Sequence, residues 1–210
     1  MPQLAVLTGD LVQSTRADAA ATEAAMTALS QGAHEIAAWI GTSTRFTRSR
    51  GDGWQIVLPL RRELALRAAI CLIARLKARR QGLATRIALG LGPYETLGSQ
   101  DLSDAHGAAF TLSGRALDGM KSGLLRLSFP AMRPLHQGFV DLLEPLLWRW
   151  TPEQAEAVAL SLHPEGRSQK DIARLLHISE QAVSLRLKGA HDHPLRQALK
   201  NWEADLLQAE

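Results

Sequence analysis

The stretch Thr47-Arg48-Ser49-Arg50-Gly51-Asp52-Gly53-Trp54-Gln55-Ile56-Val57-Leu58 decides the fold class of the first part of the chain. Its Asp52-Gly53 pair lies between two β-prone segments, residues 42–47 and 54–59, and Asp-Gly in this position is a strong signal for a hairpin turn. We therefore expect two antiparallel strands, with the carboxylate of Asp52 at the turn that joins them.

Patterns typical of helices and strands alternate on both sides of this hairpin. In chain order we expect a strand at Gln3–Leu7, helices at Ala17–Trp39 and Arg62–Gln81, a strand at Ala84–Gly90, a helix at Ser113–Lys121 and a strand at Leu124–Phe129. The order β-α-β-β-α-β, followed by α-β, resembles the split βαβ arrangement, in which two helices pack on one face of an antiparallel sheet. The sequence predicts an α+β, ferredoxin-like domain over residues 1–130.

Composition limits the class of protein. The chain has 210 residues, of which 46% are hydrophobic and 21% charged, as in an ordinary globular protein of one large or two small domains. It has no apolar run of the roughly 20 residues that a membrane span needs, and no secretory signal is visible at the N-terminus. A single cysteine, Cys71, excludes an internal disulfide or a zinc site built from cysteines. We expect a cytoplasmic protein with no membrane partner.

The sequence after Pro130 is purely helical. We interpret residues 131–150 as a helical linker, and Thr151 followed by Pro152 as the N-cap and first position of a helix that opens a second domain, residues 151–210. Residues 1–150 contain 17 Lys and Arg against 12 Asp and Glu (+5), whereas residues 151–210 contain 7 against 9 (−2). The charge totals therefore do not by themselves indicate nucleic-acid binding, which has to be argued from the local pattern.

Residues 168–190 have the layout of a helix-turn-helix. Ser168 and Ser179 stand at N-cap positions, and apolar residues fall on the inner faces of two short helices separated by the turn His177-Ile178-Ser179. This segment resembles the DNA-binding helix-turn-helix of bacterial regulators, most closely region 4 of sigma factors. In that motif the second helix enters the major groove of DNA.

The residues that would contact DNA lie on the second helix. We expect these to be Ser179, Gln181, Ser184, Leu185, Arg186 and Lys188. Glutamine pairs with adenine, and arginine or lysine reaches a base or a phosphate. The alternative is a helical hairpin that only packs or dimerises.

Two acidic residues in the first domain form a candidate metal site. Asp10 follows the first strand, and in a β-α-β-β sheet the end of that strand lies beside the hairpin turn with Asp52. Two carboxylates there suit Mg²⁺ or Mn²⁺, which prefer oxygen ligands and substrate phosphates. The backbone amides of residues 11–15, at the start of a helix, suit phosphate oxygens, which makes Ser14 and Thr15 candidate ligand-binding residues. The alternative is structural, with Asp10 capping a helix and Asp52 stabilising a turn.

A third segment, Asp104–Arg115, completes a family resemblance. With the Asp10 and Asp52 motifs, it resembles the class III nucleotidyl cyclase homology domain, and the Gly107-Ala108-Ala109-Phe110 segment is still more similar to the SatD family. The resemblance covers about residues 3–128.

The resemblance implies a role for each matching residue. Asp10 and Asp52 would be the metal carboxylates, Arg48 and Asp104 would read the base, Thr111 would replace an asparagine that orients the ribose, and Arg115 would stabilise the transferring phosphoryl group. Arginine for lysine at position 48 and threonine for asparagine at position 111 depart from the cyclase pattern, and such changes affect turnover more than binding. The resemblance also implies a homodimer, because in cyclases each site combines residues of two protomers.

These observations predict a DNA-binding transcriptional regulator. Its partners would be double-stranded DNA and a second copy of the chain, and its degenerate cyclase-like domain would dimerise and sense a nucleotide or similar phosphorylated ligand with Mg²⁺ or Mn²⁺. The alternatives are an active nucleotidyl cyclase with an accessory helix-turn-helix domain, and a protein-interaction module in which neither site works.

Overall fold

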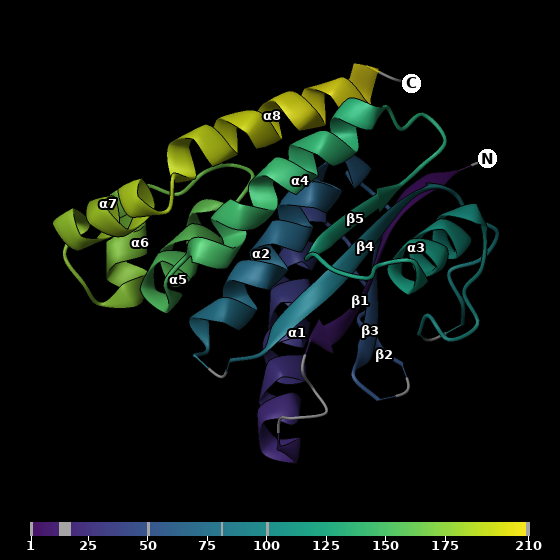
Figure 1. Cartoon of the computed structure of the whole chain (residues 1–210), viewed down its shortest axis with the longest axis horizontal. Coiled ribbons are helices and arrows are strands. Elements are labelled where there is room, and N and C mark those ends of the chain that lie inside the picture. Colours follow the sequence, from purple (N-terminus) through teal and green to yellow (C-terminus); the bar gives the residue numbers. More distant parts are fainter. Residues whose placement is uncertain (1, 13–17, 50, 81, 100, 209–210) are drawn as a thin grey trace.

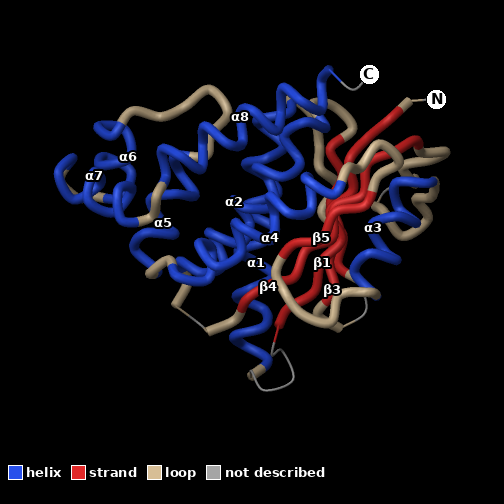
Figure 2. Tube along the Cα trace, turned by 45° about the horizontal axis from the view of Figure 1, so that its top comes forward, coloured by secondary structure: helices blue, strands red, loops and turns tan. Residues whose placement is uncertain are grey.

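A five-stranded sheet forms the first part of the chain, and the last part is entirely helical (Figures 1 and 2). The structure is a computed structural model that describes residues 2–12, 18–49, 51–80, 82–99 and 101–208. The strands are β1 (Gln3–Val12), β2 (Thr47–Arg48), β3 (Gly53–Leu58), β4 (Ala84–Pro93) and β5 (Leu125–Ser128). The α-helices are α1 (Ala19–Ile40), α2 (Ala65–Ala78), α3 (Ala108–Asp118), α4 (Pro134–Arg149), α5 (Pro152–Ser161), α6 (Gln169–Leu176), α7 (Glu180–Gly189) and α8 (Asp192–Gln208).

The sheet is mixed, and its strand order is β2-β3-β1-β4-β5. The pairs β2–β3, β3–β1 and β1–β4 are antiparallel, and β5 joins β4 in parallel. The hairpin predicted around Asp52 is confirmed as the β2–β3 pair. The α+β class is also confirmed.

Helices cover both faces of this sheet. Side chains alternate along β1, so Leu7 and Leu11 pack in the cluster that contains α1 and α2, whereas Leu4 and Val6 pack on the opposite face with Ala109 of α3. Glycine at position 90 lets α3 approach β4 closely, because a Cβ atom there would lie 2.4 Å from the carbonyl oxygen of Ala109. The two-helix layer expected from the sequence is therefore accompanied by a third helix on the other face (Figure 1).

Several predicted boundaries were wrong, for identifiable backbone reasons. The strand predicted at residues 42–47 is only two residues long, because Arg45 has a positive φ of 48° that is incompatible with a strand. The second helix begins with a 3-10 turn at Arg62–Leu64 and ends at Ala78, since Arg80 also has a positive φ. The helix predicted at Ser113–Lys121 begins earlier, directly after Gly107, whose φ of 143° ends the preceding loop.

The C-terminal helices pack on α2, on the side of the sheet away from α3 (Figures 1 and 2). Val140 and Leu147 on the inner face of α4 are buried, so residues 134–149 form a packed helix between sheet and C-terminal helices. One hydrophobic cluster extends without a break from β1 through α2 and α5 to α8. The division into two domains at residue 151 stays a prediction.

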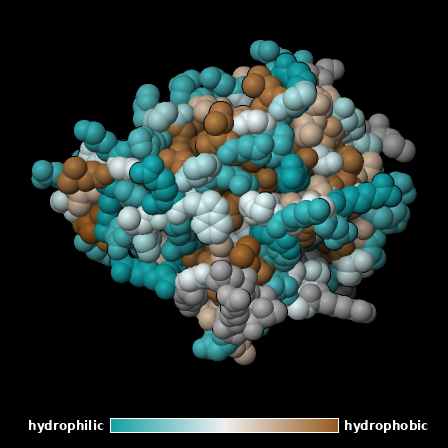
Figure 3. All heavy atoms as spheres, viewed as in Figure 1, coloured by the Kyte–Doolittle hydropathy of each residue, from teal (hydrophilic) through white to brown (hydrophobic). Residues whose placement is uncertain are grey.

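Some apolar side chains reach the surface. Figure 3 shows hydrophobic side chains between hydrophilic ones on the face that carries α4, where Leu135 and Leu142 are 74% and 81% exposed. None of the described helices combines the length and the hydrophobicity needed to cross a membrane.

Candidate functional site

The two candidate metal carboxylates lie at the same edge of the sheet. Asp10 pairs in register with Gly53 of β3 on one side and with Arg86 of β4 on the other, and the backbone N–H of Leu11 donates to the carbonyl of Asp52 at 3.3 Å. Both aspartates are half-buried. The adjacency predicted from the motif order is therefore present.

The guanidinium group of Arg86 binds one of these carboxylates. Arg86 donates from Nε to Asp10 Oδ1 at 2.8 Å and from Nη2 to Asp10 Oδ2, and its Nη1 donates to the carbonyl of Met120 at 2.7 Å. The hydrogen bonds to Asp10, together with the charges of Asp10 and Asp52, raise the pKa of Arg86. No group of three or more possible metal ligands from His, Cys, Asp and Glu occurs within the described parts of the chain.

The predicted phosphate loop has a different local structure. Strand β1 continues two residues beyond Asp10, to Val12, so the amides of Leu11 and Val12 belong to the sheet and not to a helix start. Ser14 and Thr15 lie outside the described residues. Helix α1 begins at Ala19, where the side chain of Asp18 accepts from the backbone N–H of Ala21 at 2.6 Å. The sequence signal for that cap is the acidic residue at the N-cap position.

The two candidate base-reading residues bond to different partners. Arg48 faces α1, where its two Nη atoms each donate to Glu23 at 2.8 Å. Asp104 lies in the loop before α3 and accepts from the backbone N–H of Ser99 at 3.2 Å. Each therefore has a local structural partner, and within the described residues no hydrogen bond joins the two side chains.

The two candidate catalytic residues are on α3. Thr111 and Arg115 are both exposed, one helical turn apart, on the helix that covers the second face of the sheet. The hydroxyl of Thr111 donates to the carbonyl of Gly107 in its own helix at 3.3 Å. Their side chains thus face solvent on the α3 side, and Arg48 belongs to the opposite face.

The second candidate site is formed by α6, α7 and the turn between them. The side chains of Ser168 and Ser179 accept from the backbone N–H groups of Asp171 and Ala182 at 3.1 Å each, as N-caps do. His177 adopts the left-handed conformation with a φ of 54°, and the N–H of Ile178 donates to the carbonyl of Ala173 at 3.1 Å. These bonds end α6 and turn the chain into α7.

The packing of α6 and α7 matches the predicted inner faces. The residues Ile172, Ala173, Val183 and Leu187 are buried in the main core cluster, and Ile178 packs partly against it. Two bonds fix the surrounding helices. Trp150 donates from Nε1 to the carbonyl of Ala190 at 3.0 Å, and Ser161 on α5 bonds to the buried Asp192 at the start of α8.

One face of α7 is open to solvent. Gln181, Ser184, Leu185 and Lys188 are exposed and follow the spacing i, i+3, i+4 and i+7, which places them on one side of the helix. We call these four residues the α7 stripe. Figure 1 places α7 at the end of the molecule remote from the sheet.

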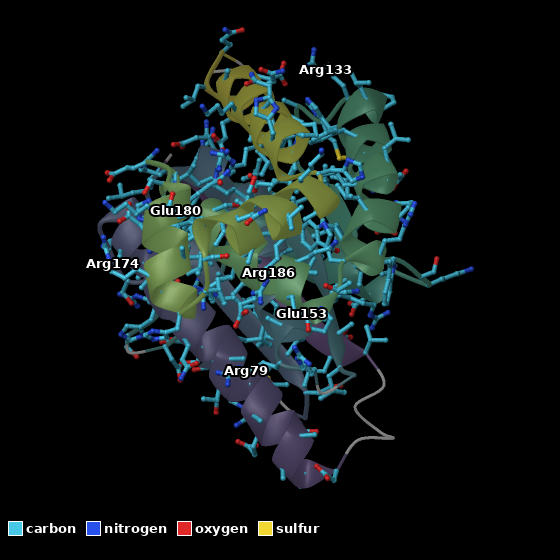
Figure 4. All side chains as sticks on the ribbon, turned by 90° about the vertical axis from the view of Figure 1, so that its left-hand side faces the viewer. Arg79, Arg133, Glu153, Arg174, Glu180 and Arg186 are labelled. Carbon is cyan, nitrogen blue, oxygen red and sulfur yellow. The ribbon has the colours of Figure 1, made fainter. Side chains whose placement is uncertain are left out.

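Arg186, which we expect from the sequence to contact DNA, does not belong to the α7 stripe. Its side chain is 22% exposed and turns toward α5, where Nη1 donates to Glu156 Oε2 at 2.9 Å. Arg186 directly follows Leu185, so its side chain projects about 100° around the helix from that of Leu185, on the side of α7 that faces α5. Figure 4 shows Arg186 beside Glu153, which is also on α5. Hydrogen bonds at the start of α5, from the backbone of Glu153 and the side chain of Thr151, lower the pKa of Glu153, and the charges of Arg80 and Arg186 add smaller contributions.

Sequence reasoning missed Arg86 and Glu156. The signal for Arg86 was its location in a strand expected to pair with the one that ends at Asp10, where opposite charges attract across the ladder. No comparable signal identified Glu156, because its contact with Arg186 depends on the angle between α5 and α7.

A cavity of about 820 Å³ lies elsewhere. It is lined by Arg62, Arg133, His136 and Asp205, between the start of β1, the start of α4 and the end of α8. None of the described site residues predicted from the sequence lines it.

Comparison with known protein families finds no family that matches this chain, and a search of curated proteins finds no match either. The geometry described above therefore carries the functional inference alone.

Proposed function

We propose that this protein is a DNA-binding transcriptional regulator in which α6 and α7 form a helix-turn-helix. The observation that carries the proposal is the α7 stripe, a solvent-facing row of side chains on a helix whose opposite face is buried. Glutamine, serine and lysine at these positions match the donors and acceptors that base edges and phosphates offer in the major groove. The groove, about 12 Å wide, admits one α-helix.

The supporting geometry lies in the turn and in the crossing of the two helices. Two serine N-caps, a left-handed residue at the end of α6 and a half-buried Ile178 fix the path from α6 to α7. Small Ala173 at the buried crossing lets the two helices approach closely. A hairpin that only packed would bury more of the α7 stripe, yet Leu185 is 65% exposed.

The proposal for the first part of the chain is a degenerate, SatD-like cyclase-homology domain that dimerises and senses a nucleotide or similar phosphorylated ligand. It is supported by the order β2-β3-β1-β4 with antiparallel neighbours, which is the order of a ferredoxin-like βαββαβ unit, and by the adjacency of Asp10 and Asp52. The Arg86–Asp10 ion pair favours binding over turnover, because a cation already engages one carboxylate that a metal would need. Thr111 and Arg115, exposed on α3, are available to a second protomer.

The DNA part of the proposal is tested by selecting duplexes from a random-sequence pool with the purified full chain. Gln181→Ala and Lys188→Ala are each expected to weaken binding of the selected duplex by about 1 to 3 kcal/mol, which is about 5- to 150-fold. Gln197→Ala and Lys200→Ala make the same substitutions at exposed positions of α8 and serve as matched controls. If no sequence is enriched, or if the α7 and α8 variants bind equally well, α7 does not read DNA.

The sensing part is tested by repeating the titration with ATP or GTP and Mg²⁺ or Mn²⁺. A nucleotide-dependent shift in DNA affinity that is lost in Asp52→Ala supports a sensor. Cyclic product from ATP or GTP with Mn²⁺, also lost in Asp52→Ala, would instead support the enzyme alternative. No shift in any condition would leave the first domain without a ligand role.

A further inference from the structure

Residues 151–210, which include the α7 stripe, have no overall excess of positive charge, although residues 167–188 contain five Lys and Arg against two Asp and Glu. Residues 151–210 have a net charge of −2, and the stripe itself contains one cation, Lys188. Attraction to phosphates supplies most of the affinity of non-specific DNA binding and steers the protein to its site. Further cations beside the α7 stripe would therefore strengthen DNA binding by this part of the chain.

The charge excess lies in α2 and its surroundings. Between residues 64 and 94 the chain contains Arg67, Arg75, Lys77, Arg79, Arg80 and Arg86 and no Asp or Glu. Arg67, Arg75 and Arg86 each form an ion pair with a carboxylate inside the fold. Arg79 and Arg80, at the end of α2, are exposed. We call this pair the α2 basic end.

The α2 basic end lies next to the helix that supports α7. Arg80 forms an ion pair with Glu153 in the first turn of α5, and Lys77 donates to the carbonyl of Trp148 just before α5 at 2.6 Å. Arg186 of α7 also acts on Glu153 through its charge and bonds to Glu156, one turn further along α5. Figure 4 shows Arg186, Glu153 and Arg79 following one another across one face of the molecule.

The cations of this end are held by weak contacts. The side chain of Arg80 is 67% exposed in its pair with Glu153, and water and salt screen an exposed ion pair of this kind so that it contributes little stability. Arg79 donates to a neutral acceptor, Oε1 of Gln31, at 2.8 Å. A phosphate can therefore replace either partner at little cost.

The two surfaces are fixed relative to each other. Helix α5 packs along α2 through buried residues such as Val158, and the thiol of Cys71 on α2 donates to the carbonyl of Ala159 on α5 at 3.7 Å. A ligand that contacts α7 and the α2 basic end at the same time does not have to order one against the other.

We propose that the α2 basic end is a second contact with the duplex that α7 reads, with Arg79 and Arg80 binding phosphates of the DNA backbone. The proposal rests on the proposed function, since it assumes that the α7 stripe binds DNA. In this proposal the first part of the chain contributes residues to the DNA interface. Glu153 then acts as a competitor that holds Arg80 in the absence of DNA.

The test measures DNA affinity as a function of salt for the full chain. The variant Arg79→Gln/Arg80→Gln is compared with Lys121→Gln/Arg126→Gln, which removes the same charge from exposed residues near β5. We expect the first variant to weaken binding of the selected duplex and of a mixed-sequence duplex by the same factor. It should also lower the slope of log K against log salt by about 1.8, for two lost phosphate contacts. The control variant should keep the wild-type slope.

A second pair of variants tests the competitor. Glu153→Gln frees Arg80 and should raise affinity for both duplexes, whereas Glu165→Gln, the same change at an exposed position in the loop before α6, should raise it less. A wild-type salt slope in Arg79→Gln/Arg80→Gln, alongside loss of selective binding in Gln181→Ala, would overturn the second contact and leave the proposed function standing. Absence of DNA binding by the wild-type chain would overturn both.

Discussion

Arg86 on β4 donates hydrogen bonds from Nε and Nη2 to the carboxylate of Asp10 on β1. The two residues are paired directly in the register of these antiparallel strands. The side chains are 29% and 24% exposed, so the pair is shielded from solvent more than a surface ion pair. The ion pair links Asp10, one of the two candidate metal ligands, to the neighbouring strand β4. Asp10 thus has a structural role whether or not it also binds a ligand.

The coupling between Asp10 and Arg86 can be measured by a double-mutant cycle with Asp10→Asn, Arg86→Gln and the double variant. We expect a coupling free energy of about 1 to 2 kcal/mol, between the values typical of exposed and buried pairs. Urea unfolding followed by circular dichroism gives the four free energies of unfolding. Arg126→Gln, on the exposed side of β5, is the control for loss of one positive charge. A coupling near zero would mean that Asp10 and Arg86 are not paired in solution.

Because α3 approaches the sheet closely, we expect replacement of glycine by alanine to have opposite effects on stability at Gly90 and at Gly114. Gly90→Ala places a Cβ atom 2.4 Å from a backbone oxygen of Ala109, so a strand or a helix must move, and we expect a loss of about 1 to 3 kcal/mol of unfolding free energy. Gly114→Ala, within α3 itself, meets no described atom within 4 Å and should stabilise the helix by up to about 1 kcal/mol. Equal effects of the two changes in thermal unfolding would contradict this placement of α3.

Local sequence signals predicted much of the fold. The Asp-Gly turn, the apolar runs and the serine caps identify the hairpin, the main strands and the helices α5 to α7, because each depends on residues close together in the chain. The wrong boundaries lie where the φ angle of a single residue determines where a strand or helix ends. Arg45 and Arg80 adopt positive φ values, which are uncommon for residues other than glycine and which shorten a strand and a helix.

The candidate sites were predicted less completely than the fold. The motif order is enough to expect Asp10 and Asp52 at one edge, and the spacing in α7 is enough to expect the α7 stripe. Neither signal reveals the three ion pairs that the structure shows. These pairs are Arg86–Asp10, Arg48–Glu23 and Arg186–Glu156. Those contacts depend on strand register and on helix crossing angles, which only the three-dimensional packing determines.

The charge cluster at the end of α8 predicts a pH dependence of stability. Asp205 accepts from Arg133 and from Nε2 of His136, the latter at 2.9 Å, and both hydrogen bonds hold the pKa of this carboxyl below its ordinary value. A lowered pKa in the folded state means that the stabilisation is complete above the unfolded pKa, about 3.9, and is lost as the pH falls through the folded pKa.

We therefore expect Asp205→Asn to lower the free energy of unfolding at neutral pH. The difference from the wild type should shrink as the pH falls below about 4. Asp118→Asn, an exposed position on α3, serves as the matched control and should give a small difference at all pH values. Urea unfolding at a series of pH values measures both. A difference between the wild type and Asp205→Asn that is constant with pH would contradict the role of the Asp205 charge.

The single cysteine reports whether the C-terminal helices separate from α2. Cys71 is fully buried between α2 and α5, and burial raises the pKa of its thiol to about 11. The thiolate is the reactive form, so the folded protein should be nearly inert to a thiol-reactive disulfide reagent at neutral pH. Because one hydrophobic cluster joins α2 to α5 and α8, we expect labelling to require global unfolding.

Labelling by way of the unfolded chain has a distinct pH profile. The rate should level off near the pKa of an exposed thiol, about 8.5, and its dependence on urea should follow the unfolding transition seen by circular dichroism. The variant Cys71→Ser/Ser122→Cys, with the thiol at an exposed position, should react at once under all conditions. If Cys71 is labelled at urea concentrations well below the transition, α5 to α8 detach from α2 as a separate unit. The rigid spacing between α7 and the α2 basic end would then be lost as well.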